Sequence, residues 1–283
     1  MINLTQLCYM FLAPLSVTSE FILIFGFWKL KQFKDHPEVM IFWQCLSQII
    51  LDVHWFTGIE TIKSTFTDEE CLFLGAFSVY FYYLSWDYSL LLSIEILLKI
   101  LNPHKTGYKA RRFWYHAIAH LTSMSIFISL MVSKTNGNSI MKTCFVQENS
   151  VYELLILLPA LIHFPLCAGI IGYTLYISHN TYFAPYLKYH MLVVATYAAS
   201  WVPIALVHGL SYSYFEVTVP IWFIYVCHYL DCCLFGWSFR VFCLPCKNVA
   251  KRPVSQDNVF DFLSKFGKSI INIEIPNGSV ECT

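Results

Sequence analysis

Seven long apolar segments constrain this chain more than any other feature of its sequence. A helix needs about 20 residues to cross a bilayer core of roughly 30 Å. The segments that reach this length lie near 6–29, 39–62, 72–100, 113–133, 151–177, 189–212 and 217–239. They predict an all-α membrane protein, with a seven-transmembrane helix bundle over residues 1–239 and a tail over residues 240–283.

The amino-acid composition also favours a membrane protein. Hydrophobic residues make up 57% of the 283 residues and charged residues 13%, about half of the charged share that globular proteins usually have. So few charges cannot cover a water-exposed surface. The composition therefore argues against a soluble enzyme, a nucleic-acid-binding protein and a disordered scaffold.

The distribution of basic residues predicts the orientation of the bundle. Lys63, Lys134 and Lys142 lie on one side of the predicted membrane, and the other 15 of the 18 Lys and Arg residues lie on the opposite side. Because cytoplasmic loops carry the excess of Lys and Arg, we expect the N-terminus outside and the C-terminus in the cytoplasm. A plasma-membrane location and contact with lipids follow from this arrangement. Asn3 is then a candidate for glycosylation.

Cysteines fall on both sides of the predicted membrane. Cys71 and Cys144 lie outside, where an oxidising compartment favours a disulfide between them, and two free thiols are the alternative. Cys243 and Cys246 follow the last span beside basic residues and are candidates for palmitoylation, with a metal or redox pair as the alternative. The tail over 257–273 has an amphipathic pattern that favours the inner leaflet, unless it is weakly ordered.

Acidic residues inside the spans are the strongest functional signal, because a charge in hydrocarbon is costly. The set is Glu20, Asp52, Asp87, Glu95 and Asp231. Since no Lys or Arg lies deep in a span, we expect these groups to be protonated, hydrated or bound to a cation. If the second and seventh spans are neighbours, Asp52 and Asp231 are placed to share a proton or hold a sodium ion. For Glu95 a helical salt bridge with Lys99 is the alternative.

The spacing of several motifs resembles that of G-protein-coupled receptors of the rhodopsin-like class. That class has an acidic residue 24 positions after the outer cysteine of span three, a proline with a later tyrosine in span five, and a Trp-x-Pro motif in span six. The matching residues here are Cys71, Glu95, Ile100, Pro103, Pro165, Tyr173, Trp201 and Pro203. The sequence departs from the class at Ile96, where the class has arginine, and at Cys232, where it has proline. Trp86 also fits the cyclic-AMP-receptor-like and secretin-like branches, so the class stays open.

This resemblance implies a ligand-operated receptor, which shifts between two helix arrangements and needs no cofactor. Its expected partners are an extracellular small molecule or peptide and a heterotrimeric G protein. The roles that it implies are a polar core or sodium site at Asp52, Ser85 and Asp231; an activation switch at Trp201, Pro203, Pro165 and Tyr173; a G-protein side at Glu95, Ile96, Ile100 and Pro103; and a ligand pocket at Ser78, Tyr82, His163, His208 and Tyr225.

Two other classes compete with a receptor. An intramembrane zinc hydrolase of the ceramidase or adiponectin-receptor type needs three ligands at one depth. His116 and His120 lie nearer the cytoplasmic end and His54 nearer the outside, so we expect neither a metal site nor catalytic residues. A small transporter is the other class, but the sequence has no internal repeat to support it.

Overall fold

The fold was analysed in a computed structural model. The residues that the structure describes are 10, 11, 13–18, 20, 21, 24, 25, 39–57, 64–101, 108–138, 143–147, 150–178, 191, 194, 195, 201–203, 205 and 206. They include α2 (Val39–Thr57), α4 (Asp68–Leu101), α5 (Tyr108–Ser133), β1 (Asn136–Asn138), β2 (Cys144–Val146), α6 (Glu153–Leu161) and α7 (His163–Ser178). The described part is thus mostly helical, as the sequence predicts.

Three segments of the described residues are long and apolar enough to cross a membrane. They are Val39–Thr57, Ala110–Ser133 and Glu153–Ser178. The predicted all-α membrane class is confirmed at this level. Half of the first predicted span, most of the sixth and all of the seventh fall outside the described residues, so the count of seven and the orientation stay predictions.

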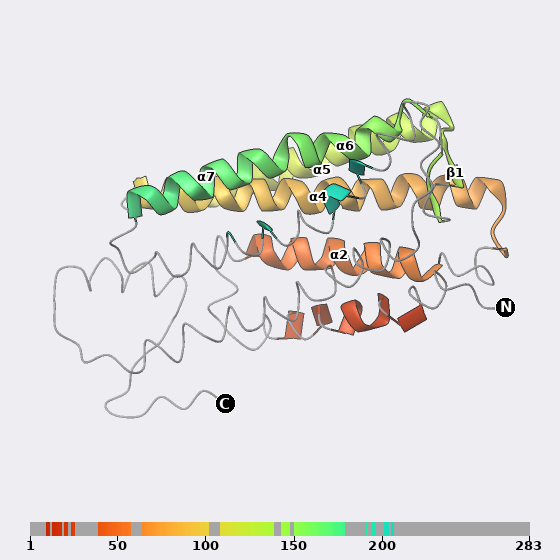
Figure 1. The fold of residues 1–283 in the computed structure, drawn as a ribbon, viewed down its shortest axis with the longest axis horizontal. Coiled ribbons are helices and arrows are strands. Elements are labelled where there is room, and N and C mark those ends of the chain that lie inside the picture. Colours follow the sequence, from red (N-terminus) through yellow and green to blue (C-terminus); the bar gives the residue numbers. More distant parts are fainter. Residues whose placement is uncertain are drawn as a thin grey trace.

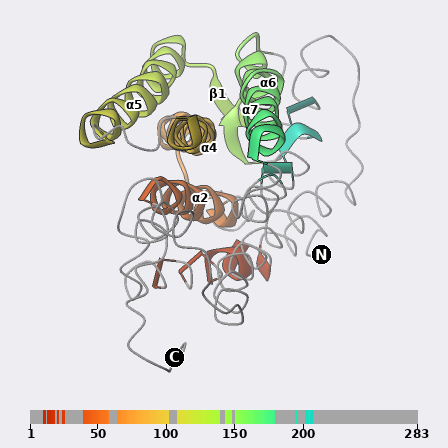
Figure 2. The same cartoon turned by 90° about the vertical axis from the view of Figure 1, so that its left-hand side faces the viewer.

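Helix α4 is the central element of the described bundle. Figure 1 shows α2 along one side of α4 and the α6–α7 segment along the other. In the end-on view of Figure 2, α4 lies between α2, α5 and α7. With 34 residues and a rise of about 1.5 Å per residue, α4 is about 50 Å long, which exceeds the thickness of a hydrocarbon core.

The N-terminus of α4 is fixed by a capping box. The Glu70 carboxylate accepts hydrogen bonds from the backbone N–H and the hydroxyl of Thr67, at 2.8 and 2.9 Å, and the Thr67 hydroxyl accepts one from the Glu70 N–H at 3.3 Å. These bonds hold the pKa of Glu70 below its usual value, and the bond from the Thr67 backbone N–H contributes most. Because polar groups extend the helix past the membrane, α4 begins at Asp68 and not near the predicted residue 72.

A short hairpin lies against the first turns of α4. Strands β1 and β2 pair antiparallel, with Gly137 opposite Phe145. A disulfide joins Cys71 to Cys144, with their Cα atoms 5.1 Å apart. The hairpin approaches α4 so closely that a Cβ atom on Gly75 would lie 2.9 Å from the carbonyl oxygen of Phe145. Glycine at this position therefore permits the contact.

The fifth predicted span is present as two helices with a break between them. Helix α6 ends at Leu161, Ile162 has φ −111° and ψ −60°, and α7 begins at His163. Pro159 lies inside α6, where it cannot donate to the carbonyl of Leu155. Pro165 lies in the first turn of α7, where a backbone N–H has no partner within its helix.

Helix α5 turns an apolar face away from the bundle. Trp114, Leu121 and Val132 have exposed fractions of 62%, 67% and 78%. Such a surface would be unfavourable in water but suits contact with lipid chains. The opposite face of α5 contacts α4 through polar side chains.

Candidate functional site

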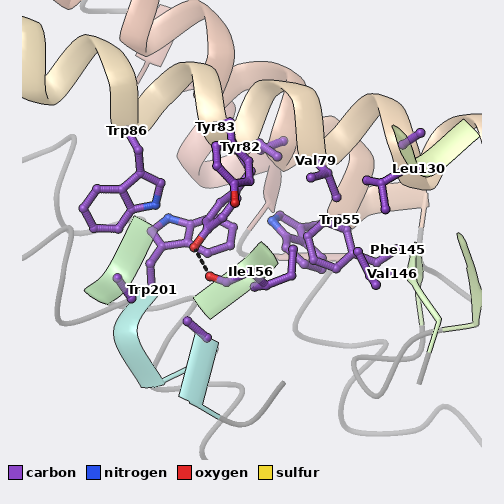
Figure 3. Packing of buried hydrophobic residues seen from close by; sticks show 14 of the residues in the cluster. Trp55, Val79, Tyr82, Tyr83, Trp86, Leu130, Phe145, Val146, Ile156 and Trp201 are labelled. Carbon is purple, nitrogen blue, oxygen red and sulfur yellow. Dashed lines mark hydrogen bonds between the residues drawn. The ribbon is translucent and has the colours of Figure 1, made fainter. Parts of the chain in front are cut away.

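Large aromatic side chains gather where α4, α2 and the hairpin meet. The ring of Trp201 lies 4.7 Å from that of Tyr82 and 6.1 Å from that of Trp55, centroid to centroid. Phe145 of β2 lies 5.7 Å from Trp55. Figure 3 shows these rings packed together with Ile156 of α6. The cluster joins residues that are far apart in the sequence, and the structure buries Tyr82, Trp55 and Trp201 almost completely.

Two tyrosines of α4 bind the backbone of α6. The Tyr83 hydroxyl donates to the carbonyl of Leu155 at 2.5 Å. The Tyr82 hydroxyl donates to the carbonyl of Ile156 at 2.8 Å, the dashed line in Figure 3. The first acceptor is the carbonyl that Pro159 leaves without its helical N–H donor. An unsatisfied carbonyl in a membrane costs several kcal/mol. The Tyr83 hydroxyl supplies the hydrogen bond that Pro159 cannot donate to this carbonyl.

A buried ion pair, which is charged when the histidine is protonated, links α4 to the start of α7. His163 Nε2 lies 2.8 Å from Asp87 Oδ1. Asp87 is 6% exposed, and the Tyr83 ring lies 6.5 Å from the imidazole. The sequence predicts that Asp87 is protonated, hydrated or bound to a cation, because no Lys or Arg lies deep in a span. The structure adds a histidine from another span as the partner of Asp87, and the protonation state of Asp87 stays a prediction.

Tyrosine and histidine side chains connect α4 to α5. The Tyr88 hydroxyl lies 2.7 Å from His116 Nδ1 and 3.2 Å from His120 Nε2, and the Tyr80 hydroxyl lies 2.5 Å from His120 Nδ1. The indole of Trp43 on α2 contacts both imidazoles edge to face. Polar contacts of this kind hold helices together where lipid leaves no hydrophobic driving force. Within the described ranges, no three His, Cys, Asp or Glu residues are placed to hold a metal ion.

A second ion pair lies at the far end of the α4–α5 contact. Arg111 binds Glu95 with two hydrogen bonds, Nε to Oε2 at 3.0 Å and a terminal nitrogen to Oε1 at 2.9 Å. The Tyr115 hydroxyl donates to Oε2 at 2.8 Å. Glu95 is fully buried, whereas the Arg111 side chain is 30% exposed. The expectation that Glu95 lacks a basic partner other than Lys99 is therefore corrected.

The other predicted site residues fall into three groups. Asp52, Ser78, Ser85 and Ile96 are buried, and Pro203 and Ile100 are half-buried. Pro165 and Tyr173 are exposed on α7. The residues outside the described part of the chain are Asn3, Pro103, His208, Tyr225, Asp231, Cys243 and Cys246.

Asp52 and Ser85 lie close in depth on neighbouring helices. Gln44 of α2 donates to the hydroxyl of Ser89 on α4 at 2.8 Å, and the two helices run in opposite directions (Figure 1). Residue 48 is therefore level with Ser85, and Asp52 lies four residues, about 6 Å, further toward the hairpin. Asp231, the third member of the predicted polar core, is outside the described residues.

Sequence reasoning missed several members of these networks. Tyr80, Tyr88, Arg111 and Tyr115 were given no role, although His116 and His120 were recognised as neighbours on one helix face. The only available signal was that spacing, since it places both imidazoles toward one neighbouring helix. Which residue of that neighbour meets them depends on the rotation and height of α4.

Comparison with known families matches part of this chain to one family. The model of the family described as serpentine type 7TM GPCR chemoreceptor Srsx matches residues 13–162, just over half of the chain. The match contains α2, α4, α5, the hairpin and α6, and thus most of the networks above. No curated protein matches the chain.

Proposed function

Because this chain belongs to the serpentine-type 7TM GPCR chemoreceptor family Srsx, we propose that it binds an extracellular small molecule or peptide and activates a heterotrimeric G protein. The receptor role and the membrane location follow from the family itself. The family is not a family of enzymes, so the zinc hydrolase alternative is set aside. The nature of the ligand and the coupling to a G protein are the proposal.

We further propose the complete architecture of seven spans, with the N-terminus outside and residues 240–283 in the cytoplasm. The disulfide between Cys71 and Cys144 supports this orientation, because disulfides persist in oxidising compartments. In this proposal the hairpin end of α4 is the outer end. The opposite end of α4, with Glu95, is then the cytoplasmic end.

The observation that carries the proposed function is the contact of Trp201 with Tyr82 and Trp55. Tyr82 lies 11 residues after Cys71 along α4, or about 16 Å from the disulfide. A ligand that enters beside the hairpin would reach this cluster first. We place the ligand pocket above Trp201, with Ser78, Tyr82 and His163 on its described side and His208 and Tyr225 as further members.

The proposed signal passes from this cluster to the cytoplasmic end. Bends at Pro203 and Pro165, with Tyr173, let the helices move, and Asp52, Ser85 and Asp231 form a polar core between the two ends. At the inner end Glu95, Ile96, Ile100 and Pro103 form the side that a G protein contacts. The remaining proposals are palmitoylation of Cys243 and Cys246 and glycosylation of Asn3.

A recruitment assay in cells tests this function. Cells that express the full chain are screened with a small-molecule and peptide library, and ligand-driven G-protein recruitment is compared between wild type, Trp201→Ala and Trp114→Ala at equal surface expression. Trp114 is the matched control because it is a tryptophan with 62% exposure on the outer face of α5. We expect Trp201→Ala to weaken the response by roughly tenfold or more.

Trp114→Ala should leave that response unchanged. A wild-type response that survives Trp201→Ala at full strength would refute the pocket. A wild type that recruits no G protein with any library member, at confirmed surface expression, would count against the ligand class or the coupling proposed here.

A further inference from the structure

Helix α4 holds the broken α6–α7 segment on both sides of its break. Before the break, Tyr82 and Tyr83 bind carbonyl groups of α6. After the break, Asp87 binds the imidazole of His163, the first residue of α7. The two halves of the segment are therefore attached to the same helix by different and chemically independent contacts.

The hydrogen-bond ladder between these attachments is incomplete, although two helical bonds still cross the break. Ile162 N–H donates to the Leu158 carbonyl at 2.9 Å, and Leu166 N–H donates to the Ile162 carbonyl at 3.2 Å. Pro165 has no N–H to add to this ladder. A change of φ and ψ at Ile162 would tilt α7 at the expense of these two bonds, while the other hydrogen bonds of α6 and α7 stay in place.

We propose that Ile162 is a hinge and that the Asp87–His163 ion pair is the releasable attachment of α7 to α4. The attachment of α6 is the fixed one, because the Leu155 carbonyl has lost its helical donor to Pro159 and needs Tyr83. This inference goes beyond the proposed receptor function, since it depends only on contacts inside the bundle.

The ion pair is suited to release because it has spare hydrogen-bonding capacity. Asp87 Oδ2 and His163 Nδ1 are buried and have no hydrogen-bond partner in the part of the chain that the structure describes. A competing donor or acceptor can therefore form a hydrogen bond with one of the two residues while the bond between Asp87 and His163 breaks. A complete exchange of partners costs less than exposing a bare charge to lipid.

Past the ion pair, α7 contacts α4 largely through apolar side chains, together with a hydrogen bond between the Cys167 thiol and Ser93. Cys167 and Ile171 of α7 pack against Leu90 of α4. Such contacts are non-directional, so they permit small shifts of α7 along α4. The ion pair sets the position of α7, and its release permits the movement.

Hydrogen–deuterium exchange of the full chain in lipid nanodiscs, at a single pH, tests the hinge. Asp87→Leu removes both carboxylate oxygens at similar volume, and Tyr83→Phe removes only the hydroxyl. We expect Asp87→Leu to raise exchange in peptides from residues 163–170 by roughly tenfold or more, with little change in residues 153–161. Tyr83→Phe should give the reverse pattern.

Two further variants protect the test against simple misfolding. Asp87→Asn keeps a neutral hydrogen bond to His163 and should raise exchange in α7 less than Asp87→Leu. The exchanged pair Asp87→His with His163→Asp should restore protection of α7. Equal loosening of both halves by Asp87→Leu and Tyr83→Phe would overturn the hinge, and unchanged exchange in α7 after Asp87→Leu would overturn the role of the ion pair.

Discussion

At Gly75 the absence of a side chain decides how closely the hairpin can lie on α4. A Cβ atom there would meet the Phe145 carbonyl at 2.9 Å and the Asn136 Cβ at 3.0 Å. The Phe145 backbone cannot easily retreat, because its neighbour Cys144 is bonded to Cys71. The steric conflict should therefore exceed the advantage that alanine has over glycine in a helix.

Gly75→Ala should lower the stability of the protein by up to about 2 kcal/mol, since overpacking costs about 1–3 kcal/mol and helix propensity returns about 1 kcal/mol. Gly169→Ala is the matched control, because its Cβ would meet nothing within 4 Å. That variant should be neutral or slightly stabilising. Thermal unfolding of both variants in detergent measures the difference, and equal effects would contradict the steric explanation.

The Arg111 guanidinium neutralises a fully buried carboxylate. Arg111→Ala should lower the free energy of unfolding by about 2 kcal/mol or more. Of the two partners Arg111 and Tyr115, Glu95 would keep only the Tyr115 hydroxyl. Arg112→Ala is the matched control, since Arg112 is exposed, and should change stability by less than about 0.5 kcal/mol. Thermal unfolding and surface expression measure the effects of the two substitutions. If the two substitutions cost the same, the ion pair does not stabilise the bundle.

At the level of single residues, sequence reasoning found the groups but not their partners. It identified Asp87 and Glu95 as buried acids that need compensation, since charge in hydrocarbon is costly wherever it lies. It could not find His163 or Arg111, which lie on other helices. Those pairings depend on how each helix is rotated about its axis, and one sequence contains no direct measure of that rotation.

Between helices α4 and α6, we expect an energetic coupling of Tyr83 with Pro159. Tyr83→Phe should lower the free energy of unfolding by about 1–2 kcal/mol, because it leaves the Leu155 carbonyl without a hydrogen-bond donor. In a Pro159→Ala background the helix regains an N–H for that carbonyl, so the same substitution should cost clearly less. A double-mutant cycle on thermal stability measures this coupling.

Tyr82→Phe provides the control for the cycle. Tyr82 binds the carbonyl of Ile156, whose helical donor is Ala160 and not a proline. Its cost should therefore be nearly the same with and without Pro159. Additive effects of Tyr83→Phe and Pro159→Ala would show that the tyrosine does not compensate for the proline.

The helices themselves were predictable in position but not in extent. Hydropathy placed the spans near 72–100 and 113–133, whereas α4 and α5 begin at Asp68 and Tyr108. Hydropathy measures the part of a helix inside the hydrocarbon. Capping groups such as Thr67 and Glu70 continue the helix beyond it, and they do so through local hydrogen bonds that a hydropathy window ignores.

For the whole molecule, the disulfide is a covalent constraint on the described part of the chain, and it joins cysteines at a sequence separation of 73. A cross-link of this span stabilises by up to about 4 kcal/mol in the chain-entropy model, and by less where the membrane already restricts the unfolded chain. Cys71→Ser, Cys144→Ser and the double variant should lower the unfolding temperature by the same amount.

Reductant provides the check on that prediction. It should bring the wild type to the level of the serine variants and leave the variants unchanged. A double variant that is clearly less stable than either single variant would indicate that the thiols contribute by packing and not by their bond.

The separation of the two cysteines along the chain also sets an order of events during synthesis. At translation rates of about 5–20 residues per second, Cys71 waits roughly 4–15 s for its partner to be made. When Cys144 emerges, α4 and α5 already exist, while nearly half of the polypeptide has yet to leave the ribosome. The hairpin can therefore be bonded to α4 before the later segments exist, and an oxidising machinery slower than this interval would leave the Cys71 thiol open to neighbouring nascent chains.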